Sequence, residues 1–277
     1  MSFFSSGPVH TALIVGALVA LVSGPVGVFT VMRGQSFAGH SLADVGTTGG
    51  SGAYLVGVNV LAGFVAINLV AAAAMEAIGM RRARGRDVAT GIVLGAALGL
   101  SALFLYLQTS SSTTGATMTV LFGSIFTFDP GYVPFVAATS VVALAVLAAL
   151  YRPLLLSSVS PELAAARGLP VGLIGAAYLV ALALAVSLSA VTIGAVLSTA
   201  LLVGPAAAAL RVTRRPGAAV LVAAAIGVAA TWAGVALSYE SYYWPPHHQG
   251  WPVSFFVVVA VLAGYVVAAA IGRRGRR

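Results

Sequence analysis

The chain has 277 residues, of which 60% are hydrophobic and only 7% are charged, and its formal net charge is +8. A soluble domain of this length could not carry so apolar a composition on its surface, so the sequence predicts an integral membrane protein. There is no lysine, which excludes a P-loop and its phosphate-binding lysine, and no cysteine, which excludes disulfides, thiolate metal ligands and cysteine nucleophiles.

Nine apolar segments, each close to the roughly 20 residues needed to cross about 30 Å of hydrocarbon, follow one another along the chain. They run over 11–32, 38–58, 60–80, 88–107, 131–150, 169–188, 190–210, 217–238 and 253–272. We therefore predict an all-α, polytopic membrane bundle of about nine transmembrane helices, with eight possible, forming a single domain over residues 1–277. The glycine-rich stretch 46–52 interrupts the second segment, where the sequence allows a short or broken helix that lines a cavity.

All fourteen basic residues are arginines, and they follow alternate segments. Arg33 comes after the first segment, and the rest come after the third, fifth, seventh and ninth (Arg81, Arg82, Arg84, Arg86, Arg152, Arg167, Arg211, Arg214, Arg215, Arg273, Arg274, Arg276 and Arg277). By the positive-inside rule this side is cytoplasmic, so we expect the N-terminus outside and the C-terminus in the cytoplasm. Topology and anionic lipid then explain the positive charge without nucleic-acid binding.

The second segment carries a histidine and an aspartate four residues apart, His40 and Asp44. On a helix this spacing places both side chains on one face, one turn apart. Ionisable groups inside a bilayer segment cost about 2.5–3.5 kcal/mol each, so they usually face a pathway or a partner rather than lipid. Side by side, the two groups could share a divalent cation or relay a proton. Alternatively, they hydrogen-bond each other or cap the helix start.

Two later segments carry small or hydroxyl-bearing residues with a recognisable arrangement. Gly91, Gly95 and Gly99 repeat every four residues in the fourth segment, which predicts a smooth strip where another helix can approach closely. The seventh segment contains three hydroxyl residues, Thr192, Ser198 and Thr199, whose side chains could line a pathway. Hydroxyls in membrane helices more often bond their own backbone, and that alternative stays open.

The polar stretch between the fifth and sixth segments predicts a short helix at the cytoplasmic surface. Ser160 can cap a helix whose first turn holds Pro161 and Glu162, and Gly168 can end it just after Arg167. Such a helix, about two turns long between two membrane spans, is a natural contact for a soluble subunit. An ordinary interfacial turn is the alternative interpretation.

A second pair of histidines, His247 and His248, lies in the outer-side stretch YESYYWPPHHQGWP. These side chains could help to capture a metal ion delivered from outside. The alternative is an aromatic belt with proline-rich turns, in which the histidines are incidental.

The order of these features resembles that of the permease subunit of zinc/manganese-type ABC importers over nearly the whole chain. The matching stretches are GVFTVMRGQSFAGHSLADVG at 27–46, TVLFGSIFTFDP at 119–130, SPELAAARGLP at 160–170, TIGAVLSTALLVGPAAAALRV at 192–212 and LSYESYYWPPHHQG at 237–250. In that family an arginine closes the first helix, a serine-rich helix with an acid and a histidine follows, and a short loop helix docks on the ATPase. The lack of lysine fits a permease that borrows its ATPase.

The chain departs from the family pattern at the ionisable pair. The family places aspartate first and histidine four residues later, whereas here His40 precedes Asp44. The exchange keeps both ligand types but moves the carboxylate by one turn, about 6 Å along the helix axis, which could alter metal choice or coordination geometry. The family's leucine-proline-glycine continuation is also replaced, by Val45, Gly46 and Thr47.

The resemblance implies alternating access in a bacterial cell membrane. Two copies of the chain would form the pathway, an extracytoplasmic metal-binding protein would deliver zinc or manganese as the transported substrate, and no tightly bound cofactor is expected. His40 and Asp44 would hold the ion transiently, and acidification should compete with it because neutral histidine and ionised carboxylate are the metal-competent forms. Two cytoplasmic ATP-binding subunits would dock at the short loop helix (Ser160, Pro161, Glu162, Ala165, Arg167 and Gly168).

The expected role is therefore transport, with ATP hydrolysis supplied by a separate subunit. Two other interpretations remain: the same architecture carrying a metal chelate or another small solute, and a proton-coupled secondary transporter or channel in which His40 and Asp44 relay protons. An intramembrane protease or other enzyme is disfavoured, because the sequence has no paired catalytic aspartates, HExxH or nucleophile motif.

Overall fold

The computed structural model describes residues 7–79, 83–109, 120–123, 125–127, 130–244 and 250–274, and all regular secondary structure within these ranges is helical. The long helices are α1 (Gly7–Met32), α2 (Ser36–Leu55), α3 (Val60–Gly79), α4 (Ala83–Thr109), α6 (Val133–Val159), α8 (Val171–Ile193), α9 (Ala195–Val212), α10 (Pro216–Ser241) and α11 (Val253–Arg274). The short helix α7 (Pro161–Ala166) joins α6 to α8, and single 3-10 turns occupy Ile125–Thr127 (η2) and Pro130–Tyr132 (η3).

These long helices correspond one by one to the predicted segments, which confirms the all-α membrane class. Among the described residues, eight of them are long and apolar enough to cross a membrane, and α2 is the exception. Its glycines, hydroxyl residues, histidine and aspartate lower its hydropathy. The count of eight or nine spans therefore depends on α2 alone.

The break that the sequence allowed in the second segment does not occur: α2 runs without interruption through the glycine-rich stretch. These glycines serve close helix packing. A Cβ atom at Gly49 would collide with the backbone of Gly63 in α3, and one at Gly46 or Gly50 would collide with the ring of Phe64. Small residues let membrane helices approach until their backbones touch, so the packing compensates for the low helix propensity of glycine.

Two helix boundaries differ from those expected from hydropathy. The helix α6 continues to Val159, beyond the predicted end at residue 150, and Pro153 lies inside it. The junction between α8 and α9 falls at Gly194, whose φ of +92° favours glycine, rather than near residue 189. The length of an apolar segment indicates how many residues can lie in hydrocarbon. It does not indicate where the helix itself begins or ends.

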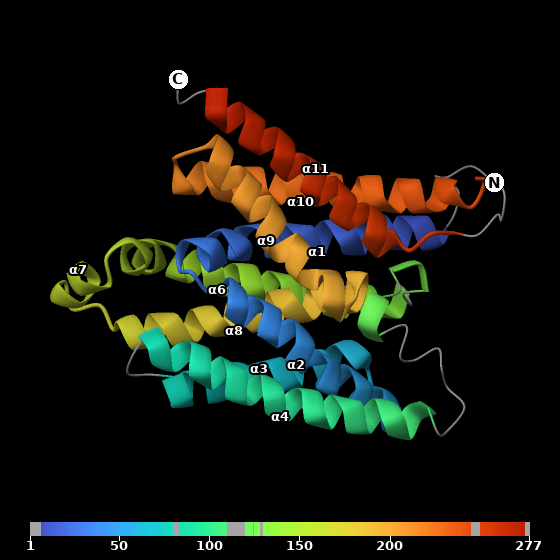
Figure 1. The fold of residues 1–277 in the computed structure, drawn as a ribbon, viewed down its shortest axis with the longest axis horizontal. Helices are drawn as coiled ribbons and strands as arrows, with labels where there is room; N and C mark the ends of the chain where they lie inside the picture. Colours follow the sequence, from blue (N-terminus) through green and yellow to red (C-terminus); the bar gives the residue numbers. More distant parts are fainter. Residues whose placement is uncertain are drawn as a thin grey trace.

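The helix α1 lies inside the bundle and is buried along most of its length. A Cβ atom at Gly24 would collide with the backbone of Ala223 in α10, and one at Gly27 with the backbone of Leu202 in α9. The helices α2, α3 and α4 pack together on one side of α1, and α9, α10 and α11 lie on the other (Figure 1). The helix α9 nevertheless reaches across to the first half of α2, where a Cβ atom at Gly39 would lie 2.9 Å from the side chain of Leu202.

The strip Gly91, Gly95 and Gly99 does not meet another helix within the described part of this chain. All three positions are exposed, and a Cβ atom added at any of them would have no neighbour within 4 Å. The reason is the place of α4, which lies at the edge of the bundle against α2 and α3 (Figure 1). The expected close approach is therefore wrong for the chain by itself.

The described arginines gather at one end of the bundle. The turn after α1, the connection through α7, the turn between α9 and α10 and the end of α11 all lie at that end, whereas α1 begins at the other (Figure 1). This arrangement agrees with the alternation predicted from the sequence.

Candidate functional site

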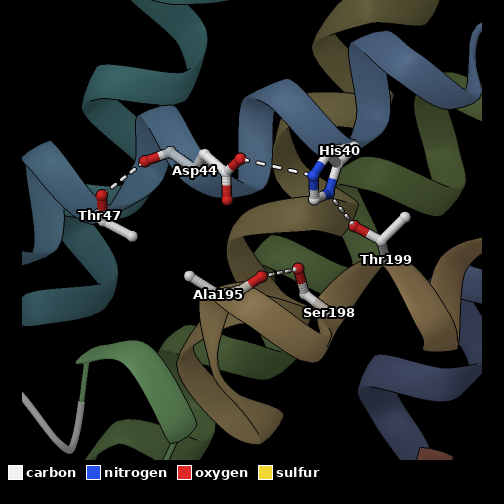
Figure 2. A network of polar contacts seen from close by, with 6 residues as sticks. All are labelled: His40, Asp44, Thr47, Ala195, Ser198 and Thr199. Atoms are coloured by element: carbon white, nitrogen blue, oxygen red, sulfur yellow. Dashed lines mark hydrogen bonds and ion pairs between the residues drawn. The ribbon is translucent and has the colours of Figure 1, made fainter. Parts of the chain in front are cut away.

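His40 and Asp44 lie on one face of α2, one turn apart, as their spacing predicts (Figure 2). The Nε2 atom of His40 is 3.6 Å from Oδ2 of Asp44, and the two side chains are 49% and 25% exposed. Most of the remaining α2 surface is buried, although Phe37 near its start and Tyr54 and Leu55 at its end are also exposed. The pair therefore occupies a partly open face of a mostly buried helix.

Hydrogen bonds to α9 and to α4 fix this part of α2 from two directions. On the α9 side, the hydroxyl of Thr199 lies 3.1 Å from Nδ1 of His40 (Figure 2). On the other side, the Thr47 hydroxyl donates to the backbone oxygen of Asp44 at 2.5 Å and lies 2.8 Å from the hydroxyl of Ser101 in α4. A hydrogen bond at Nδ1 orients the imidazole ring and leaves Nε2 directed at the carboxylate.

This geometry suits transient binding of a divalent cation. An imidazole nitrogen and a carboxylate oxygen turned toward a common space are ligands that both zinc and manganese accept. Zinc sites in proteins are almost always four-coordinate, so two donors do not complete the shell. Within the described residues, no group of three or more histidines and acids gathers at one place. Further ligands would have to be of another kind, such as backbone or hydroxyl oxygens, water, or groups of another molecule.

The three hydroxyl residues named from the sequence divide into two kinds. Thr192 donates to the backbone oxygens of Leu188 and Ser189, and Ser198 donates to that of Ala195, so these two follow the backbone-bonding alternative. Thr199, one residue further along α9, reaches the histidine instead.

The short helix predicted between the fifth and sixth segments is present as α7, which is six residues long. The Ser160 hydroxyl accepts a hydrogen bond from the backbone N–H of Leu163 at 3.3 Å, and Pro161 and Glu162 occupy the first turn. Gly168 has a φ of +75°, which ends the helix after Arg167. Ala165 and Arg167 are exposed, and Ala164 is buried and anchors the helix to the bundle. The helix protrudes at the arginine-rich end (Figure 1).

His247 and His248 lie outside the described residues, so their predicted role stays a prediction. The residues on either side of this stretch form an aromatic cluster: the rings of Trp244 and Trp251 are 6.1 Å apart, and Trp251 stacks on Phe256. Next to it is a cavity of about 690 Å³, which Tyr239, Tyr242, Tyr243 and Trp251 help to line. An aromatic belt at a membrane interface has this composition.

Inside the bundle, polar side chains from different helices bond one another, which sequence reasoning did not predict. The hydroxyls of Ser23 in α1 and Ser189 in α8 are 2.7 Å apart, and the amide of Asn68 in α3 donates to Ser187 at 2.9 Å. A further network joins Arg33 to α6 and α8. The sequence shows that Arg33 directly follows one apolar segment and that Tyr178 is the one tyrosine within another. Nothing in the sequence indicates that these two residues meet.

Comparison with known proteins agrees with this architecture. Residues 7–269 match the ABC 3 transport family. The manganese transport system membrane protein MntC of Halalkalibacterium halodurans is 30% identical over 228 residues, which cover 82% of this chain and 77% of that protein. The high-affinity zinc uptake system membrane protein ZnuB of Haemophilus influenzae is 28% identical over 205 residues, which cover 74% of this chain and 78% of that protein.

The fold is likewise shared with a solved structure, that of PsaBC from Streptococcus pneumoniae in complex with Fab. The TM-score is 0.82 at 23% sequence identity, and the superposition covers 98% of this chain and 95% of that chain. Because the sequence match runs from α1 into α11 and the fold agrees over the same length, the chain belongs to the ABC 3 transport family.

Proposed function

We propose that this chain is the membrane permease subunit of an ATP-binding-cassette importer, and that it carries a divalent metal ion, zinc or manganese, into the cytoplasm by alternating access. The observation that carries the proposal is the His40–Asp44 pair, whose potential metal ligands, Nε2 and Oδ2, are 3.6 Å apart on a partly open face of α2. The relatives named as manganese and zinc transport proteins support the same class of substrate. Weak, incomplete coordination suits a transit site, because transport requires release as well as binding.

A second copy of the chain would complete the site. The pair faces outward from its own bundle and offers two protein ligands, so two copies related by a twofold axis would offer four. Each chain would act as one transmembrane domain over residues 1–277, and the pathway would lie between the two copies.

The two ends of the bundle would meet different partners. At the arginine-rich end, which we place in the cytoplasm, the capped helix α7 would dock on one of two ATP-binding subunits. At the other end, which carries the aromatic cluster, an extracytoplasmic metal-binding protein would deliver the ion. The chain itself has no lysine for a P-loop, so its role is transport and hydrolysis belongs to the partner. Its location is the bacterial cell membrane, which it crosses several times.

The alternatives raised by the sequence have less support. A proton-coupled transporter needs no ATPase, whereas the family match is to ABC transport. A metal chelate would present ligand atoms of its own to the pathway and would not need the imidazole and carboxylate to lie side by side.

The proposal is tested with the permease, its ATPase and its binding protein reconstituted in lipid vesicles. Zinc, manganese and iron are offered in turn, and metal-stimulated ATP hydrolysis and metal accumulation are measured together. The His40→Gln variant removes one donor, and His10→Gln, at an exposed position of α1, is the matched control.

We expect one metal to be accumulated, and we expect His40→Gln to reduce accumulation by at least about tenfold while His10→Gln does not. If no metal is accumulated by the unaltered complex, or if the two variants behave alike, the proposal is wrong.

A further inference from the structure

We propose that Arg33 is a positioning residue that couples movement of α7 to the His40–Asp44 pair. The inference rests on the proposed function, because it assumes that an ATPase acts on α7. The ionisable pair lies on α2, whereas the ATPase would act on α7. Movement of α7 therefore needs a mechanical connection to the pair, and Arg33 would provide it.

Arg33 contacts both helices that flank α7. It follows the last residue of α1, and its Nη1 atom donates to the hydroxyl of Ser157 in α6 at 3.1 Å. Its guanidinium carbon lies 5.4 Å from the centre of the Tyr178 ring in α8. One planar group thus hydrogen-bonds to α6 and packs on an aromatic ring of α8, a combination that the guanidinium shape allows.

The contact on α8 is rigid. Tyr178 is completely buried, and its hydroxyl lies 2.6 Å from that of Thr30 in α1 and also donates to the backbone oxygen of Val26. A buried tyrosine that is fixed at its hydroxyl cannot move without α1. The end of α1 therefore follows α8 closely.

The contact on α6 lies beside α7 in the chain. Ser157 is in the last turn of α6, three residues before Ser160, which caps α7. The backbone N–H of Leu169, after α7, in turn bonds the oxygen of Ala164 within it, so α7 and the start of α8 are tied together. A displacement of α7 consequently reaches both positions that Arg33 holds.

The connection from Arg33 to the metal pair is short. Gly34, with a φ of +65°, and Gln35 alone separate Arg33 from α2, and the N–H of Gln35 bonds the oxygen of Thr30 at 2.9 Å. His40 lies one turn beyond the start of α2. The hydrogen-bonded turn can therefore transmit a shift of Arg33 to the histidine without being lost in a flexible loop.

The test measures how many metal ions are accumulated for each ATP hydrolysed, in vesicles that hold the complete complex. Arg33→Lys keeps the positive charge but cannot both hydrogen-bond to Ser157 and stack on Tyr178. Arg211→Lys is the matched control, because Arg211 makes the same two kinds of contact with Tyr265, at 3.0 Å and 5.7 Å, away from α7.

We expect Arg33→Lys to hydrolyse ATP and to retain its ATPase subunit, with the ratio of metal to ATP reduced by about fivefold, and Arg211→Lys to keep the ratio of the unaltered complex. Ser157→Ala removes one contact of Arg33 without changing any charge, and it should also lower the ratio of metal to ATP. It replaces Arg33→Lys in the test if the complex with Arg33→Lys does not assemble.

An unchanged ratio in Arg33→Lys, or in Ser157→Ala where Arg33→Lys does not assemble, would overturn the inference while leaving the proposed function intact. The same holds if accumulation and hydrolysis fall together, as they would for a residue needed only for folding. If the unaltered complex accumulates no metal at all, the proposed function fails and this inference fails with it.

Discussion

The histidine at the centre of the site owes its orientation to one hydroxyl group on another helix. Thr199→Val keeps the shape of that side chain but removes the hydrogen bond to Nδ1 of His40. Because loss of such an orienting partner typically costs about 10–100-fold in metal affinity, we expect the metal concentration for half-maximal transport to rise about tenfold. Transport kinetics in vesicles measure this value.

The controls for this prediction come from the same turn of α9. Thr199→Ser should restore near-normal kinetics, because it returns the hydroxyl. Ser198→Ala should change little, because that hydroxyl bonds its own backbone at Ala195. Equal kinetics for Thr199→Val and Ser198→Ala would show that the hydrogen bond does not position the ligand.

At this scale the sequence predicts local contacts and misses distant ones. The juxtaposition of His40 and Asp44 follows from helical spacing alone, and so does the capping of α7 by Ser160. The partner of His40 is 159 positions away in the chain, and that of Arg33 is 124 positions away. Such pairs depend on how helices pack, which periodicity does not encode.

The helix α7 provides a prediction at the scale of one element. Ser160→Ala removes the cap on the N–H of Leu163, which costs about 1 kcal/mol of helix stability and corresponds to about a fivefold change in an equilibrium constant. We therefore expect the ATPase subunit to bind the permease several-fold more weakly, as measured by titration of the purified subunit onto the detergent-solubilised permease.

The comparison variants separate capping from simple loss of a hydroxyl. Ser160→Asp should bind the ATPase as the unaltered chain does, because aspartate is an equally good cap. Ser158→Ala loses only a bond to its own helix, at Leu154, and should also bind normally. Normal binding by Ser160→Ala would argue against α7 as the docking element.

The contact between α2 and α3 explains why a glycine-rich stretch stays helical. Gly63→Ala would push a Cβ atom into the backbone of Gly49 and into Ala53. Overpacking of this kind costs about 1–3 kcal/mol, so we expect the melting temperature in detergent to fall by several degrees. Gly95→Ala, where the added atom meets nothing within 4 Å, should leave the melting temperature unchanged or raise it. Equal melting temperatures would contradict the packing described.

Every long helix in the described part of the chain corresponds to an apolar segment of the sequence, but not every boundary does. Hydropathy found the segments because lipid-facing and core-facing residues are both apolar. It wrongly allowed a break in α2, since glycine disfavours a helix until a neighbouring backbone compensates, as Gly63 does for Gly49. It also ended α6 too early, because polar residues such as Arg152 interrupt the apolar run in the last turns of the helix.

For the whole molecule, the arginine distribution predicts orientation. The chain has no cysteine, so single cysteines can be introduced without background. We expect Tyr243→Cys, at an exposed position just after α10, to react with a membrane-impermeant maleimide in intact cells, and Leu163→Cys, on α7, to react only after permeabilisation. The reverse pattern of labelling would place the N-terminus in the cytoplasm and contradict the proposed direction of transport.

The central claim is that the His40–Asp44 pair lies on the path of a divalent metal ion, and metal accumulation by Asp44→Asn tests it most directly. Asparagine keeps the size of the side chain and removes the charge that binds the metal. With the complete complex in vesicles, we expect Asp44→Asn to accumulate no more metal than vesicles without ATP, while the subunits remain assembled. Accumulation equal to that of the unaltered complex would show that the ion crosses the membrane by another route.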